Sequence, residues 1–144
     1  MNNKYEIGRD VAIKYIMFKK RTEFEVKNKL QMLNYSPIII DKVITSLKDD
    51  GYINDKEYIK KYFKELKALK NWSIIQVKTN LSKRGCECTI SDSELTKYEI
   101  NSITNLYSKF SFKYPKATKE EKESFIHALQ SKGFVYENIK NVIK

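Results

Sequence analysis

Four lysines at helical spacing are the side chains of this sequence best placed to bind an anion. Lys56, Lys60, Lys64 and Lys67 follow one another at intervals of four, four and three residues, which places them along one face of a helix. Like charges at this spacing destabilise a helix by about 0.2–0.5 kcal/mol per pair, and Glu57 offsets only part of that cost. The stripe therefore predicts contact with DNA phosphates or with an acidic protein surface, and the alternative is a solvated helix face.

A tryptophan and further basic residues extend this candidate. Trp72 directly precedes Ser73, a residue type that often caps helices. We expect its ring either to pack on Gln76 or Val77 of the following helix, which is the ordinary structural role, or to stack on a base or a protein partner. The full set of candidate contact residues is Lys56, Lys60, Lys64, Lys67, Lys70, Trp72, Lys78, Lys83 and Arg84.

The overall charge also favours an anionic partner. The 144 residues carry a formal charge of +10, and residues 56–84 alone contribute +7 from nine basic and two acidic side chains. Only Arg9, Arg21 and Arg84 are arginines, and lysine cannot make the forked contact that arginine makes to phosphate or guanine. We therefore expect contact with single- or double-stranded DNA to be weak and salt-dependent.

The residue patterns of enzymes and metal sites are missing from the sequence. Cys86 and Cys88 have only His127 as a further nitrogen or sulfur ligand, which is too few for zinc. Cys86 stands where a repeated pattern places an apolar anchor, so we expect it to be buried as a small hydrophobic residue. No nucleophile–base pair or glycine-rich phosphate loop occurs. We expect no enzyme activity, no catalytic residue, no cofactor and no metal.

A pattern that occurs three times predicts the elements that position these residues. Leu30, Leu81 and Leu129 lie 51 and 48 residues apart, and each follows an apolar residue by four positions. An anchor residue stands five positions after each leucine. A fixed period near fifty, with apolar residues at helical spacing, predicts small helical units that pack on their neighbours. The three anchors are Tyr35, Cys86 and Phe134.

The predicted fold is all-α, an elongated array of three tandem three-helix repeats with about nine helices in helix-turn-helix-like units. The repeats are expected at residues 1–52, 53–98 and 99–144, and the third helix of the second repeat, around residues 87–97, is degenerate. Four capping boxes and one Ser-Pro pair predict helix starts. The boxes are Thr22 with Glu25, Asn54 with Glu57, Ser73 with Gln76 and Thr118 with Glu121, and the pair is Ser36-Pro37.

The composition indicates where in the cell the protein acts. No run approaches the roughly 20 apolar residues of a membrane span. Residues 1–5 lack the apolar core of a signal peptide. The two closely spaced cysteines make no disulfide framework, so we expect a cytoplasmic protein with no membrane contact, acting as a monomer.

Three segments resemble the RecX family. They are the capped helix that contains Thr22, Glu25 and Leu30, the Gly-Tyr-Ile-Asn-Asp junction of residues 51–55, and the Gly-Phe-Val-Tyr-Glu-Asn-Ile run of residues 133–139. The similarity extends from about Ala12 to Val142. It implies tandem three-helix repeats that bind the RecA filament on DNA along its helical groove. It also implies inhibition of strand exchange and coprotease activity, within DNA repair, DNA recombination and the SOS response, with no catalytic residues.

Two other functions stay open at the level of sequence. Three-helix units also occur in helix-turn-helix transcriptional regulators that bind specific DNA. The third helices would then offer Asp41, Lys42, Thr45 and Ser46, or Asn138 and Asn141, to base edges, which is a poor match to the usual Arg, Asn and Gln contacts. A protein–protein adaptor without nucleic-acid contact is the other alternative, and low sensitivity of binding to salt would distinguish it.

Overall fold

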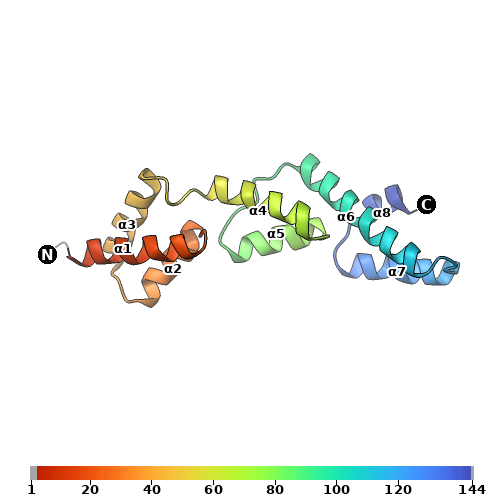
Figure 1. The fold of residues 1–144 in the computed structure, drawn as a ribbon, viewed down its shortest axis with the longest axis horizontal. Helices are drawn as coiled ribbons and strands as arrows, with labels where there is room; N and C mark the ends of the chain where they lie inside the picture. The colour runs from red at the N-terminus through yellow and green to blue at the C-terminus, as the bar shows by residue number, and fades with distance from the viewer. Residues whose placement is uncertain (1–2, 144) are drawn as a thin grey trace. The chain divides into compact units, whose positions relative to one another are not determined.

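The computed structural model describes residues 3–143, and these residues form helices without any strand (Figure 1). The predicted all-α class is confirmed. Residues 1–2 and 144, at the outer ends of the first and third predicted repeats, lie outside the described part. The eight helices are α1 (Asn3–Phe18), α2 (Glu23–Met32), α3 (Pro37–Asp49), α4 (Asp55–Leu69), α5 (Ile74–Lys83), α6 (Asp92–Lys113), α7 (Lys119–Ser131) and α8 (Tyr136–Val142).

The described residues contain eight helices instead of about nine, because one long helix takes the place of two that were expected. Residues 92–97 of the weak helix expected around 87–97 and the helix expected from Ile100 are both parts of α6, which is 22 residues long, whereas residues 87–91 precede it without forming a helix. Ser91 caps its start by accepting a hydrogen bond from the amide of Glu94 at 3.2 Å. No glycine or proline interrupts the helix, and Leu95, Tyr98 and Ser102 continue a single buried stripe.

The predicted helix starts are confirmed. Complete capping boxes occur at Thr22 and Thr118. Ser73 exchanges the same two hydrogen bonds with Gln76, at 3.2 Å and 2.8 Å. Asn54 accepts from the amide of Glu57 at 3.2 Å, and Ser36 caps α3 with Pro37 as its first residue. Each cap satisfies an amide that the helix itself leaves without a partner.

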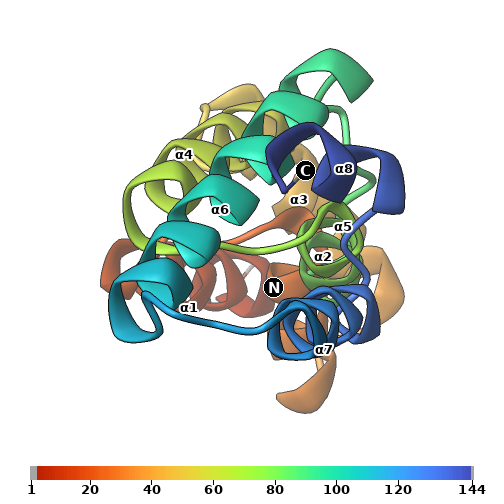
Figure 2. The same ribbon diagram turned by 90° about the vertical axis from the view of Figure 1, so that its right-hand side faces the viewer.

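The chain divides into two compact units, each with its own core. Unit 1 comprises Met1–Lys61 with Leu81–Cys88, and unit 2 comprises Tyr62–Asn80 with Thr89–Lys144. In unit 1, α1 packs against α2 and α3. In unit 2, α8 lies beside α6 (Figure 2). Leu30, Leu81 and Leu129 of the repeated pattern are all buried, as predicted.

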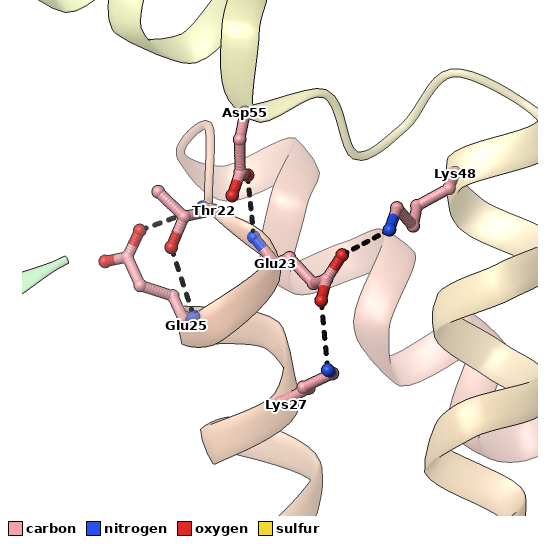
Figure 3. Close-up of polar contacts among 6 residues, drawn as sticks. All are labelled: Thr22, Glu23, Glu25, Lys27, Lys48 and Asp55. Carbon is pink, nitrogen blue, oxygen red and sulfur yellow. Dashed lines mark hydrogen bonds and ion pairs between the residues drawn. The ribbon is translucent and has the colours of Figure 1, made fainter. Parts of the chain in front are cut away.

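The start of α2 in unit 1 is bonded to two segments far along the chain. The hydroxyl of Thr22 donates to the main-chain carbonyl of Arg84 at 2.7 Å. The amide of Glu23 donates to a carboxylate oxygen of Asp55 at 3.0 Å (Figure 3). Gly85, at φ +74°, lies so close that an added Cβ would stand 2.2 Å from the Cβ of Phe24. We call this set of contacts the Thr22 junction.

The start of α5 in unit 2 has the same contacts one period later. The hydroxyl of Ser73 donates to the carbonyl of Lys132 at 2.9 Å, and the amide of Ile74 donates to Glu99 at 2.6 Å. A Cβ on Gly133 would stand 2.4 Å from the side chain of Ile75. We call this set the Ser73 junction. Its cap and carbonyl lie 51 and 48 residues after those of the Thr22 junction, which are the spacings of the repeated leucines.

A buried carboxylate adds a third helix to the Ser73 junction. Glu99 is fully buried in α6, and besides the amide of Ile74 it accepts from the amide of Val135 at 2.7 Å and the side-chain amide of Asn138 at 2.9 Å. Both helix starts that face it present amide donors and the positive end of a helix dipole. Glu99 therefore connects α6 to the N-terminal ends of α5 and α8.

Glu23 joins α2 to α3 by an ion pair. Its carboxylate lies 2.7 Å from the ammonium of Lys48 and 2.9 Å from that of Lys27 (Figure 3). The hydrogen bond from Lys48, followed by that from Lys27, lowers the pKa of Glu23 and outweighs the opposing effect of burial. A lowered pKa means that the folded state favours the ionised form, so this contribution is present above the unfolded-state pKa and is lost as the pH falls through the folded-state pKa.

The junction contacts predict unequal effects of alanine at two glycines with left-handed backbone. Gly51→Ala, at φ +80° with open space around it, should cost about 1–2 kcal/mol from the backbone conformation alone. Gly85→Ala should cost about 1–3 kcal/mol more, because the new methyl group overlaps Phe24. Urea unfolding of both variants measures the difference. Equal losses would show that the close approach in the Thr22 junction does not exist.

The ion pair predicts a pH-dependent effect of Glu23→Gln. At neutral pH the variant should lower the free energy of unfolding by at most about 1 kcal/mol, because the pair is partly solvated. The difference should shrink as the pH falls below the ordinary glutamate pKa of 4.5, since the protonated wild type loses the same pairs. Glu57→Gln is the control, because Glu57 and Lys60 are largely exposed and 3.8 Å apart. A difference that stays constant across this pH range would refute the pairing.

Candidate functional site

The predicted lysine stripe lies on α4, and all four of its members are exposed. Lys56, Lys60, Lys64 and Lys67 occupy the solvent side of the helix. The opposite side is buried and carries Ile59, Tyr62, Phe63 and Leu66. This amphipathic division explains why the segment is helical, since burial of one face stabilises the helix and leaves the other face to the charged side chains.

One end of the stripe is positioned by aromatic packing inside unit 2. The ammonium of Lys67 lies 4.6 Å from the ring centroid of Phe63, within cation–π range. Phe63 in turn makes an edge-to-face contact with Tyr98 of α6, with ring centroids 5.5 Å apart. A cavity of about 190 Å³ lies beside these residues, lined by Lys67, Glu94, Lys97, Tyr98 and Asn101.

The connection between α4 and α5 is held in place by α6. The hydroxyl of Tyr98 donates to the carbonyl of Lys70 at 2.8 Å and accepts from the amide of Trp72 at 3.2 Å. Asn105 donates to the side chain of Asn71 at 3.0 Å. The exposed Lys70 and the half-buried Trp72 are therefore carried on a fixed connection and not on a loose loop. The structure brings Lys67, Lys70 and Trp72 together around Tyr98.

The three remaining candidate contact residues differ from one another in exposure and in the contacts that they make. Lys78 and Lys83 are exposed on α5, in unit 2 and unit 1 respectively. Arg84 is half-buried, donates to the hydroxyl of Tyr58 at 2.5 Å, and has its guanidinium 5.9 Å from the centroid of that ring. Burial raises the pKa of Tyr58, so the phenol stays neutral and bound to Arg84 at physiological pH. This placement indicates a packing role for Arg84 within unit 1.

Sequence reasoning missed Lys97 and Tyr98, which complete the surroundings of Lys67. Lys97 ends the segment that was expected to be a degenerate helix, and Tyr98 follows it directly in α6. The spacing of Leu95, Tyr98 and Ser102 could have identified the continuous buried face. The buried Glu99 was also missed, and an isolated glutamate in a helix gives no sequence signal that its partners lie in α5 and α8.

The cysteines have the expected environment for a structural residue. Cys86 is buried, and burial is the main cause that raises the pKa of its thiol to about 11, so it is protonated at physiological pH. Cys88 is half-buried. Within residues 3–143, no group of three or more His, Cys, Asp or Glu side chains could hold a metal ion.

None of the helices described is both long enough and apolar enough to span a membrane.

The sequence matches known proteins along most of its length. Residues 9–47 match the model of a protein family described as "RecX, first three-helix domain". The regulatory protein RecX of Streptococcus sanguinis is 30% identical over 142 residues, covering 95% of this chain and 54% of that protein. RecX of Streptococcus agalactiae has the same identity and coverage. The chain thus spans about half the length of the curated relatives it matches.

A solved structure matches over nearly the whole of both chains. The crystal structure of RecX from Lactobacillus salivarius has 28% sequence identity and a TM-score of 0.87, and the match covers 99% of this chain and 96% of that one. The resemblance seen in the sequence is therefore confirmed: RecX proteins are similar to this chain in both sequence and fold.

Proposed function

We propose that this chain binds the RecA–DNA filament along its groove and inhibits the recombinase and coprotease activities of RecA, without catalysis of its own. The observation that carries the proposal is the agreement in fold with a RecX crystal structure over 99% of the chain. The relatives that match it in sequence bear the name regulatory protein RecX. The chain would act in the cytoplasm as a monomer, with no membrane contact.

The exposed basic residues of α4 and of the connection after it supply contacts for such a role. Lys60 pairs with Glu57 at 3.8 Å, and both side chains are largely exposed, so the pair neutralises little of the stripe's charge. An anionic partner would relieve the repulsion among neighbouring lysines. Lys67, Lys70 and Trp72 are held by contacts to Phe63 and Tyr98, which reduces the conformational entropy lost on binding.

The structure gives less support to a sequence-specific helix-turn-helix regulator. Asn138 is only 7% exposed and donates to Glu99, so its amide is committed within unit 2. Ser46 accepts from Arg9, which also pairs with Asp50. A neighbouring cavity of about 650 Å³ is lined in part by Asp41, Asp49 and Asp50, whose carboxylates would repel DNA phosphates.

Direct inhibition of the cognate RecA tests the proposal. DNA-dependent ATP hydrolysis and strand exchange should both fall as the chain is added, and a pulldown should retain RecA best when single-stranded DNA and a nonhydrolysable nucleotide are present. Unaltered RecA activity at a large molar excess of the chain over filament sites would refute it. Salt-insensitive binding to RecA–DNA would indicate an adaptor that contacts protein alone.

A charge reversal on α4 predicts weaker inhibition. Lys60→Glu/Lys64→Glu should raise the chain concentration for half-inhibition at least about tenfold, the factor that corresponds to roughly 1.4 kcal/mol of binding free energy. The effect should diminish at high salt, because it arises from screened charges.

A matched control separates position from net charge. Lys4→Glu/Lys14→Glu makes the same change in charge at two exposed positions of α1, and it should leave the half-inhibition concentration close to that of the wild type. Circular dichroism checks that both variants are folded. If the folded α4 variant inhibits as well as the wild type, the α4 stripe is not part of the interface.

A further inference from the structure

The end of α6 and the turn that follows it form a basic and aromatic surface in unit 2 that the proposed interface does not use. Residues 100–119 contain no aspartate or glutamate. They contain four lysines, of which Lys113 and Lys116 flank the turn at Tyr114 and Pro115. We call residues 110–119 the α6–α7 tip.

Aromatic stacking fixes the base of this tip. The rings of Phe110 in α6 and Phe125 in α7 stack with centroids 4.4 Å apart and an interplanar angle of 16°. Tyr107 and Tyr114 also pack on Phe110, with ring centroids 6.3 Å and 5.4 Å from its own. Such contacts add roughly 0.5–1.5 kcal/mol per pair beyond burial of area, so α6 and α7 hold the turn in a defined position.

Phe112 is almost entirely exposed to solvent. Its side chain is 90% exposed, and Tyr114 beside it is 44% exposed. The ammonium of Lys113 lies 5.4 Å from the centroid of the Tyr114 ring. A phenylalanine this exposed gains almost nothing from the fold, because hydrophobic stabilisation scales with the apolar area removed from water. The exposed ring of Phe112 instead lies next in sequence to Lys113 and close to Lys116.

We propose that the α6–α7 tip binds single-stranded nucleic acid, with a base stacked on Phe112 and the backbone phosphates of neighbouring nucleotides held by Lys113 and Lys116. Unpaired bases stack on exposed aromatic rings without regard to sequence, and lysines follow the phosphate backbone. The biological role of this site rests on the proposed function, to which it adds a place where DNA is contacted. The binding itself requires no RecA.

The surroundings of the tip fit a single strand better than a membrane surface or a duplex. Two acidic side chains, Glu120 and Glu121, follow the tip in the first turn of α7, and Glu121 is engaged in a capping box with the amide of Thr118. A membrane surface would need more apolar area than one fully exposed phenylalanine supplies. A duplex hides its base faces in the stack and would leave Phe112 without a partner, whereas a single strand offers both base faces and phosphates.

The test measures binding of a fluorescently labelled oligothymidylate of about 16 nucleotides to the isolated chain, without RecA. Phe112→Ala should weaken binding at least about fivefold, the factor for roughly 1 kcal/mol of lost stacking, while the slope of log affinity against log salt stays unchanged. Phe112→Trp should bind at least as tightly as the wild type. Lys113→Gln/Lys116→Gln should instead reduce the magnitude of the salt slope by about 0.7 for each phosphate that is no longer bound.

Ile38→Ala serves as the control, because Ile38 is another exposed apolar side chain, 71% exposed on α3. It should leave both the affinity and the slope unchanged. Equal oligothymidylate affinity of folded Phe112→Ala and wild type would overturn the site, whatever the chain does to RecA. So would binding to vesicles of anionic lipid that depends on Phe112 while oligonucleotide binding does not. Inhibition of RecA by a chain that fails this test would leave the proposed function standing.

Discussion

A hydroxyl that caps the start of one helix and also bonds to a carbonyl at the end of another is the interaction on which the fold depends. Thr22 does this for α2 and the end of α5, and Ser73 does it for α5 and the end of α7. At each site a glycine leaves room for a side chain of the other helix, and a carboxylate accepts the first helical amide. Buried polar groups of this kind are costly when they lose a partner, so the helix ends must meet in one register.

The same constraint positions the candidate interface in unit 2. Two consecutive residues of α6 hold the connection between α4 and α5: Tyr98 bonds to Lys70 and Trp72, and Glu99 bonds to Ile74. The buried carboxylate of Glu99 therefore also positions exposed residues, since it fixes the point at which the connection enters α5. Binding residues on an ordered connection lose less conformational entropy when a partner arrives than the same residues on a mobile loop.

Local signals in the sequence predicted the all-α class and most helix starts, because caps and apolar spacing act within a few residues. The long α6 was divided wrongly at residues 97–100, where a degenerate pattern concealed a continuous buried face. Glu99 and Tyr98 were missed because their partners come from distant segments, and Lys97 because the cavity that it lines is shared with the distant Lys67. The spacings of 51 and 48 residues were recognised in the leucines but not in the paired caps and glycines. The boundaries of the three repeats and the binding residues stay predictions.

The contacts of the Ser73 junction share one helix end, so we expect them to act as one cooperative set and not as independent hydrogen bonds. A double-mutant cycle with Ser73→Ala and Glu99→Gln, measured by urea unfolding, tests this most directly, because the two side chains bond to the same end of α5 without bonding to each other. We expect a coupling free energy of about 1 kcal/mol or more, within the range seen for residues that share one network. Losses that add to within roughly 0.3 kcal/mol would contradict it.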